Sequence, residues 1–418
     1  MLFKGDCRDF MVGCEPETFH AIVTDPPYHL TSVVKRFGKP GSAPARHGTD
    51  GLYARHSRGF MGKEWDGGGI AFDPATWALA WDCLKPGGHL VAFGGTRTHH
   101  RMACAIEDAG FEIRDCLMWI YGTGFPKSHD VSKGIDKAAG AEREIVGQHE
   151  RINFRGGGAG FRNLDGLTDG DGVIYLTAPA TPEAAAWEGW GTALKPAWEP
   201  IVLARKPLIG TVAANVLAHG TGALNIDACR IPGEGVPLFG HKDGAGAAVY
   251  GGGFNGSYRA GEISHAGRWP ANVVHDGSGE VEGAFAAFGG GKSGAVARHN
   301  GAFKSVAKGP DRPHTSFGYA DSGTASRFFY SAKASKTDRA GSKHPTIKPL
   351  ALMRWLVGLV CPPGGHVLDP FAGSGSTLRA ALDLGMQATG CEMDPEYQGD
   401  IERRLGLKTE PTLEDMLT

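Results

Sequence analysis

An acidic, proline-rich corner follows the first buried run of the sequence. Residues 24–30 read TDPPYHL and come directly after a short apolar run at 21–23. A partly β-branched apolar run of this kind predicts a buried strand, so Asp25 stands where the chain leaves a sheet. The two prolines fix φ and carry no N–H, which leaves their carbonyls as acceptors only. Together with the flat ring of Tyr28, this corner predicts a site for a planar group that donates two hydrogen bonds.

A glycine-rich turn near the other end of the chain could bind a cofactor. Gly373 and Gly375 lie between an expected strand at 366–371 and an expected helix at 377–385, where a backbone can approach a ligand closely. Glu392 follows 17 positions after Gly375, close to the spacing at which an acidic residue takes ribose hydroxyls. The turn lacks both the third glycine of a dinucleotide fingerprint and the G-K-[ST] of a P-loop. A nucleoside cofactor without phosphate therefore fits better, although such a turn also serves simply to join a strand to a helix.

These two features resemble the motifs of the DNA amino-methyltransferases, which methylate an exocyclic amine of adenine or cytosine with S-adenosylmethionine. The family's [DNS]-P-P-[YFW] motif corresponds to residues 25–28, and its F-x-G-x-G motif corresponds to residues 371–375. HPTIKP at 344–349 is similar to the segment that precedes the cofactor half. Since the catalytic motif comes first, the order resembles the circularly permuted group often called beta.

The resemblance implies a set of functional residues. The catalytic ones would be Asp25, Pro26, Pro27 and Tyr28. Those that bind S-adenosylmethionine would be Asp6, Cys7, His344, Thr346, Lys348, Asp369, Phe371, Gly373, Ser374, Gly375, Thr377, Glu392 and Met393. Asp6 is nearly as well explained as a plain turn former. A basic stretch at 31–70 offers DNA contacts through Lys35, Arg36, Arg55 and Arg58.

The chemistry follows from the weakness of an aromatic amine as a nucleophile. The Asp25 carboxylate and the Pro26 carbonyl would hold both N–H bonds, so that the nitrogen lone pair points at the methyl donor while Tyr28 stacks on the base. Transfer is then a direct displacement that depends on positioning and preorganised electrostatics. A base inside a duplex cannot reach such a pocket, so we expect it to flip out of the helix.

Alternating strand and helix signals predict an α/β fold with a mostly parallel sheet. A helix is expected at 73–84, the breaker KPGG at 85–88 and a strand at 89–95. The resemblance implies a Rossmann-like methyltransferase core, circularly permuted, with an inserted target-recognition region. The expected division is a catalytic half at 1–126, a long insert at 127–194, a returning core strand at 195–208, a target-recognition region at 209–330 and a cofactor half at 331–418.

Composition narrows the expected partners. The 418 residues carry a net charge of −2, but residues 195–348 alone carry +7, which suggests a local surface for a polyanion or simply a solvated basic face. The eight cysteines form no C-x-x-C pair, so neither a zinc site nor a disulfide framework is expected. The scattered cysteines fit a reducing cytoplasm, and no apolar run is long enough to span a bilayer, so we expect a cytoplasmic protein with no membrane partner. The resemblance implies double-stranded DNA as partner, makes a homodimer plausible, and leaves open whether a restriction enzyme accompanies the protein.

Several functions remain open from the sequence. Asp rather than Ser at position 25 favours adenine N6 over cytosine N4. RNA or a protein amide could replace DNA, because similar tetrapeptides serve those methyltransferases. A different class is a catalytically inactive DNA-binding regulator on the same fold, against which the intact Asp25, Tyr28, Gly373 and Glu392 count.

Overall fold

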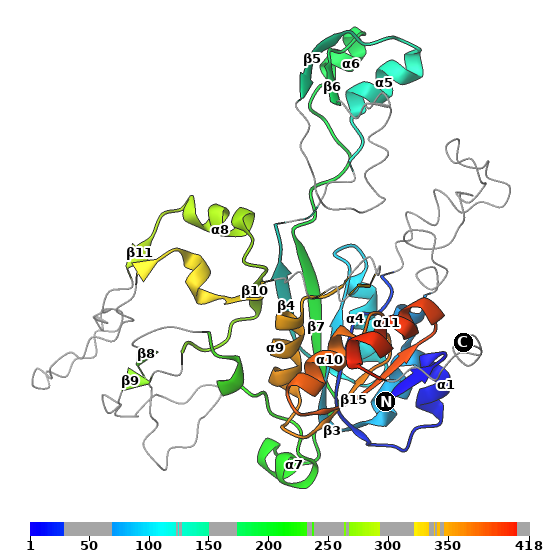
Figure 1. The fold of residues 1–418 in the computed structure, drawn as a ribbon, viewed down its shortest axis with the longest axis vertical. Helices are drawn as coiled ribbons and strands as arrows, with labels where there is room; N and C mark the ends of the chain where they lie inside the picture. The colour runs from blue at the N-terminus through cyan, green and yellow to red at the C-terminus, as the bar shows by residue number, and fades with distance from the viewer. Residues whose placement is uncertain are drawn as a thin grey trace, which may run out of the picture. The chain divides into compact units, whose positions relative to one another are not determined.

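The chain divides into two compact units in the computed structural model (Figure 1). The larger unit consists of Met1–Gly122 with Trp198–Thr418, and the smaller unit is Thr123–Ala197. The residues that the structure describes are 1–28, 69–122, 124, 128–149, 174–231, 236–237, 263–264, 267–292, 322–333, 338, 341–342 and 347–407. Within these ranges, no helix is long and apolar enough to cross a membrane.

The larger unit is built on one sheet, which has nine strands in the described part of the chain. Their order across the sheet is β1 (Leu2–Lys4), β15 (Gln387–Glu392), β14 (His366–Asp369), β2 (Phe19–Thr24), β3 (Leu84–Phe93), β7 (Trp198–Arg205), β4 (Glu112–Ile120), β10 (Val273–His275) and β13 (Tyr330–Ser331). All neighbouring pairs are parallel except β3–β7 and β7–β4. The predicted α/β fold with a mostly parallel sheet is therefore confirmed.

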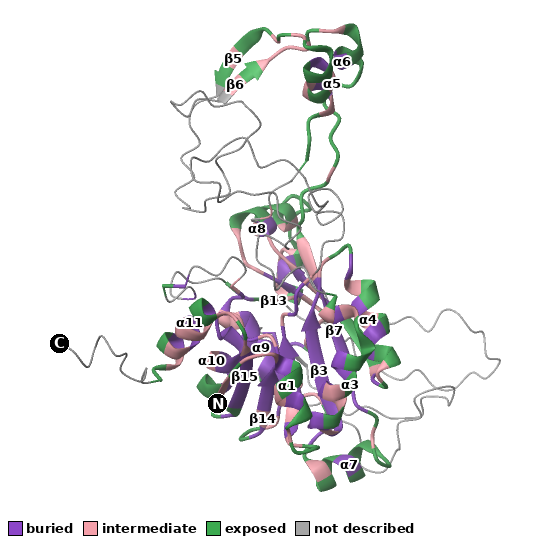
Figure 2. Cartoon of the chain, turned by 90° about the vertical axis from the view of Figure 1, so that its right-hand side faces the viewer, coloured by how far each residue is buried: buried purple, intermediate pink, exposed green. Residues whose placement is uncertain are grey.

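The central strands are apolar on both faces, as a sheet covered by helices on each side requires. In β2, Val23 joins one hydrophobic cluster while Ile22 joins the other, and in β3 the same holds for Val91 and Leu90. Successive strand residues point to opposite faces, so the two clusters are the two faces of the sheet. Figure 2 shows these strands as the most buried part of the unit, with exposed residues on the helices outside.

Helices cover each face. The cluster that contains Ile22 includes residues of α1 (Cys7–Val12), α3 (Pro74–Cys83) and α4 (His99–Asp108). The cluster that contains Val23 includes residues of α9 (Leu350–Val360), α10 (Ser376–Asp383) and α11 (Pro395–Leu405).

The start of α3 illustrates how the sequence sets these boundaries. The Asp73 carboxylate accepts a hydrogen bond from the Ala75 N–H, and Pro74 occupies the first helical position, where a missing N–H costs nothing. The helix expected at 73–84 is confirmed to within one residue at each end.

One local expectation was wrong. The segment 85–88 is not a break before the strand but lies inside β3, where the register against β2 jumps from the pair Phe19–Leu84 to the pair Ala21–His89. Gly87 has φ +75°, which accommodates this irregularity without ending the strand. The sequence also gave no sign that β7 runs against both of its neighbours.

The segment expected to recognise the target contributes to the sheet as well. It contains α7 (Val212–His219), β10, α8 (Gly279–Ala286) and two antiparallel pairs of two-residue strands, β8 (Val236–Pro237) with β9 (Ile263–Ser264) and β11 (Gly291–Lys292) with β12 (Ser322–Gly323). Short 3₁₀ helices lie at Ile70–Phe72, Asp227–Cys229 and Ala325–Phe328. The assignment of this segment to target recognition stays a prediction, as do the other four divisions.

The smaller unit has its own secondary structure and a buried polar centre. It contains α5 (Val131–Ala139), β5 (Ile145–His149) paired with β6 (Ile174–Thr177), and α6 (Pro182–Ala186). The buried Asp136 carboxylate accepts hydrogen bonds from Arg143 at 2.6 Å and from the Thr181 hydroxyl at 2.8 Å. These partners satisfy the buried carboxylate and tie the end of α5 to the start of α6.

Candidate active site

The acidic corner and the glycine turn lie side by side at one edge of the sheet. β2 and β14 are parallel neighbours, with Val367 opposite Ala21, so their carboxyl ends emerge together. The corner continues from β2 and the turn continues from β14. The buried Thr24 hydroxyl bridges them by donating to Asp369 Oδ1 at 2.6 Å. Two segments about 345 residues apart in sequence thus meet where open α/β sheets bind their ligands.

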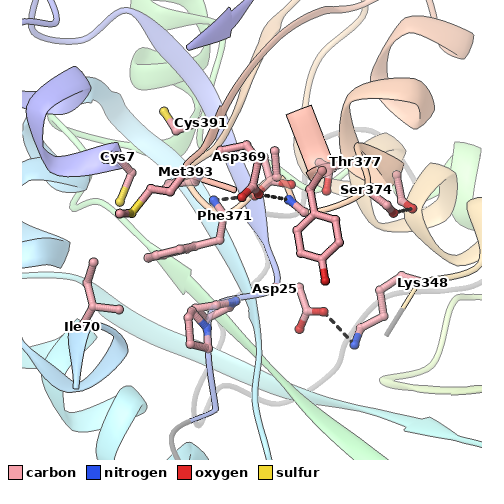
Figure 3. A pocket seen from close by; sticks show the side chains of 18 of the residues that line it. Cys7, Asp25, Ile70, Lys348, Asp369, Phe371, Ser374, Thr377, Cys391 and Met393 are labelled. Carbon is pink, nitrogen blue, oxygen red and sulfur yellow. Dashed lines mark hydrogen bonds and ion pairs between the residues drawn. The ribbon is translucent and has the colours of Figure 1, made fainter. Parts of the chain in front are cut away.

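One cavity of about 280 Å³ lies between them (Figure 3). Most of the described site residues predicted from the sequence line it, namely Cys7, Asp25, Pro26, Pro27, Tyr28, Lys348, Asp369, Phe371, Gly373, Ser374, Thr377, Glu392 and Met393. Asp6 and Gly375 do not line it. His344, Thr346, Lys35, Arg36, Arg55 and Arg58 lie outside the described residues.

The glycine turn presents its backbone to the cavity and is fixed from behind. Gly373 and Gly375 have φ of 51° and 77°, which side chains rarely tolerate. The Gly373 N–H donates to Glu392 Oε2 at 2.8 Å, and the Asp394 N–H donates to Oε1 at 2.7 Å. A Cβ on Gly375 would come within 3.1 Å of the Ile401 side chain, so this glycine allows close packing of the turn against α11.

Two carboxyl groups that line the cavity, the buried Asp369 and the half-buried Glu392, have raised pKa values. Burial raises the pKa of Glu392 to about 7, against the opposing effect of the two backbone N–H groups. Burial also raises the pKa of Asp369 to about 6, although hydrogen bonds from Thr24, Thr377 and the Phe371 N–H lower it in part. Each Glu392 oxygen accepts one backbone bond and has a further lone pair to offer a ligand.

At the other end of the cavity, four polar side chains form a network. The Tyr28 hydroxyl lies 2.8 Å from Asp25 Oδ1 and 3.1 Å from Glu199 Oε2. Lys348 Nζ lies 2.9 Å from Asp25 Oδ2, 3.0 Å from Glu199 Oε2 and 3.2 Å from the Tyr28 hydroxyl. Figure 3 shows the Asp25 carboxylate facing the Lys348 amine.

This network holds Lys348 charged. Burial alone would lower the pKa of Lys348, but the carboxylates of Asp25 and Glu199 raise it above the usual value. Burial, followed by the same two carboxylates, raises the pKa of Tyr28 well above 10, so its hydroxyl keeps its proton. Lys348, expected among the residues that bind S-adenosylmethionine, places its amine against Asp25 and Glu199. Its role toward the cofactor stays a prediction.

The two residues predicted near the start of the chain, Asp6 and Cys7, have different surroundings. The Asp6 carboxylate caps α1 by accepting from the Arg8 N–H at 2.8 Å and pairs with the Arg8 guanidinium at 2.6 Å. The hydrogen bond from Arg8 lowers the pKa of Asp6. This is the turn-forming role that the sequence left open. Cys7 lines the cavity, and burial raises the pKa of its thiol to about 12, so it packs there as a neutral group.

Several residues at the site were missed by the sequence analysis. Thr24 and Glu199 take part through the hydrogen bonds described above, and Ile70, Met353 and Tyr397 line the cavity. Glu199 left one signal, since it is a carboxylate one residue into the strand β7, whose following residues are largely apolar and buried. Nothing in the sequence distinguishes the lining residues Ile70, Met353 and Tyr397 from other apolar or aromatic residues that pack in helices.

No group of three or more acidic, histidine or cysteine side chains that could hold a metal ion occurs among the residues with described positions. All eight cysteines are free thiols.

Comparisons with known proteins find similarities to DNA methyltransferases. Residues 255–403 match the family model N6_N4_Mtase, described as DNA methylase. The chain is 22% identical over 423 residues to the Type II methyltransferase M.HindIII of Haemophilus influenzae, covering 94% of this chain and 91% of that protein. It is 38% identical over 73 residues to the DNA adenine methyltransferase YhdJ of Escherichia coli, covering 18% of this chain and 25% of that protein. The chain is also similar to a solved structure, the cytosine-N4-specific PvuII DNA methyltransferase, at 13% identity and a TM-score of 0.41. The match covers 100% of this chain and 89% of that chain.

Proposed function

We propose that the chain, whose residues 255–403 match the DNA methylase family model, transfers a methyl group from S-adenosylmethionine to the N6 amine of an adenine in duplex DNA. The observation that carries this proposal is the single cavity shared by the acidic corner and the glycine turn. A methyl donor and a captured amine have to face each other within bonding reach, and only a shared cavity allows this.

The glycine turn and Glu392 suit the nucleoside end of the donor. The Glu392 carboxylate, oriented by the N–H groups of Gly373 and Asp394, has lone pairs available for two ribose hydroxyls. Cys7 and Phe371 provide apolar surface in the same cavity, which suits an adenine ring. When bound, S-adenosylmethionine supplies a sulfonium methyl that an amine can displace directly.

The acidic corner suits the amine. The Asp25 carboxylate and the Pro26 carbonyl accept its two N–H bonds, and this draws the nitrogen lone pair out of conjugation with the ring. Tyr28 stacks on the base and compensates part of the unstacking cost of flipping. The reaction depends on holding the two reactants in line, so no covalent intermediate on the protein is required.

Adenine is proposed over cytosine because position 25 is Asp, whereas members that act on cytosine N4 more often carry Ser there. Incubation of the protein with DNA and S-adenosylmethionine, followed by digestion to nucleosides and mass spectrometry, tests this. We expect N6-methyladenine. Detection of N4-methylcytosine alone would show that the target base is cytosine rather than adenine. Methylation of RNA or protein, but not of DNA, would show that the substrate belongs to another class.

The DNA substrate has a separate test in salt. The net charge of +7 over residues 195–348 suits phosphate contacts, and such contacts release counterions when they form. Affinity for a duplex should therefore fall steeply as salt rises. Affinity that does not change with salt would argue against a duplex bound through this segment.

A further inference from the structure

Glu199 lies at the acidic corner but outside the cavity that would hold the methyl donor. It belongs to β7, the strand that runs against its neighbours, and it is absent from the cavity lining. Its Oε2 atom nevertheless lies within hydrogen-bond distance of both Tyr28 and Lys348. A direct contact with the donor is therefore not its role, and its effect has to pass through these two side chains.

Both oxygens of Asp25 are engaged in the structure. Oδ1 accepts from the Tyr28 hydroxyl at 2.8 Å, and Oδ2 pairs with Lys348 Nζ at 2.9 Å. A carboxylate that already holds a hydroxyl proton and an ammonium is a weaker acceptor for an incoming amine, since each charge-assisted bond draws electron density from it. Asp25 becomes a better acceptor if these two donors turn elsewhere.

Glu199 offers both donors the alternative partner. The Tyr28 oxygen is 3.1 Å from Glu199 Oε2, so its hydrogen bond can pass from Asp25 to Glu199 by rotation of the hydroxyl hydrogen alone. Lys348 Nζ lies almost equally far from the two carboxylates, at 2.9 and 3.0 Å. Two acidic groups thus share one ammonium, and the corner keeps a net negative charge to attract the amine.

Lys348 itself is held in place, so it cannot leave the corner. Its side chain is 5% exposed, and Nζ lies 4.7 Å from the centre of the Phe93 ring and 5.6 Å from that of Tyr28. A buried ammonium needs carboxylate partners, and aromatic faces add to its stabilisation. With the cation fixed, the distribution of its charge depends on which carboxylates stand beside it.

We propose that Glu199 is a positioning residue, which takes the Tyr28 hydroxyl and shares the Lys348 ammonium so that the Asp25 carboxylate is free to accept the target amine. This inference rests on the proposed methyl transfer and adds to it a residue of the amine site. The competing explanation is that Glu199 only neutralises a buried lysine, and it has a different consequence. Loss of Glu199 would then reduce stability and donor binding together, with no separate effect on transfer.

The test compares Glu199→Gln with a matched variant, Glu112→Gln. Gln keeps the shape of Glu199 but removes its charge, so Lys348 would turn fully to Asp25. Glu112 of β4 is paired with Arg205 of β7 at 2.6 Å, and neither residue lines the cavity, so its loss removes an ion pair outside the site. The measurements are kcat with DNA, KM for S-adenosylmethionine, donor affinity by calorimetry and the melting temperature.

We expect kcat of Glu199→Gln to fall by about tenfold, the effect of one charge-assisted hydrogen bond, while KM for the donor stays within about twofold. Glu112→Gln should keep kcat. Unchanged kcat in Glu199→Gln would overturn the inference, and so would a parallel loss of kcat, donor affinity and melting temperature. If the wild-type protein binds the donor but methylates no DNA, the proposed function is wrong, and the proposed role of Glu199 is wrong with it.

Discussion

At the scale of single residues, the buried carboxyl groups make the cavity sensitive to pH. Burial raises the pKa of Glu392 from 4.5 to about 7, so in the absence of ligand the group is largely protonated below neutrality. Ribose hydroxyls bind best to the ionised form, because charge-assisted hydrogen bonds are stronger than neutral ones.

Donor affinity should therefore weaken as the pH falls from about 8 to 6, and calorimetric titration at several pH values measures this. The contribution of Glu392 to folding has the opposite sign. The folded protein binds this proton more tightly than the unfolded chain does, so the group lowers the free energy of unfolding as the pH rises from 4.5 to about 7. Glu392→Gln should remove most of the pH dependence of donor binding. If the variant keeps that dependence, another group is responsible.

Thr24 connects the two halves of the site. Its buried hydroxyl donates to the Asp369 carboxylate, and Thr24→Val removes this donor without changing the size of the side chain. We expect a loss of about 1–3 kcal/mol in the free energy of unfolding by urea, because a buried carboxylate loses a partner.

The loss should be larger at pH 8 than at pH 5, since burial raises the pKa of Asp369 to about 6 and the group is mostly neutral at pH 5. Thr18→Val serves as the control, because its hydroxyl donates to the Glu15 carbonyl at an exposed position. If the two variants lose the same free energy of unfolding at pH 8, the hydrogen bond from Thr24 to Asp369 contributes no more than an exposed one.

At the scale of elements, close approach of β15 to the glycine turn fixes where the turn lies. A Cβ on Gly390 would stand 2.7 Å from the Leu378 side chain and 2.9 Å from the Ala372 Cβ. Gly390→Ala should therefore reduce the free energy of unfolding by about 1–3 kcal/mol through overpacking. Because Ala372 precedes Gly373, donor affinity should fall as well.

Gly283→Ala is the matched control in α8, where an added Cβ would meet nothing within 4 Å. In this helix the change should stabilise the protein by about 0.5–1 kcal/mol, since alanine loses less conformational freedom than glycine. Thermal unfolding and donor titration of both variants measure these effects. Unchanged stability in Gly390→Ala would mean that β15 and α10 can separate freely.

The sequence predicted the elements better than their directions. Runs such as 21–23 and 367–368 are apolar and have turn residues close by, so their strands could be recognised locally. The direction of β7 could not, because a strand has the same residue pattern whichever way its neighbours run. The network of Glu199, Lys348 and Tyr28 was missed for the same reason. It joins three segments that are far apart in sequence, and only β7 in the reversed direction brings its first residues to the corner.

At the scale of the whole molecule, the smaller unit interrupts a strand pair of the larger one. The last residue of β4 and the first of β7, Ile120 and Trp198, face each other across the antiparallel pair. Residues 123–197 therefore leave and re-enter the larger unit between adjacent strands. A short hairpin turn could join those strands, as turns of two to five residues commonly do.

Replacement of residues 123–197 by a short glycine–asparagine linker should leave the larger unit folded. We expect a single cooperative melting transition and donor affinity within about twofold of the intact chain, because the described lining of the cavity comes entirely from the larger unit. Calorimetry measures both. Loss of the cooperative transition would show that the larger unit needs the smaller one to fold.

The central claim is that the corner at Asp25 captures the amine in the same cavity in which the glycine turn holds the methyl donor. Single-turnover transfer from prebound, radiolabelled S-adenosylmethionine to DNA tests it most directly, comparing the wild type with Asp25→Ala. We predict that the variant binds the donor within about threefold of the wild type and transfers the methyl group at least 10²-fold more slowly, about the cost of removing one preorganised polar group. Transfer by Asp25→Ala at the wild-type rate would contradict the account.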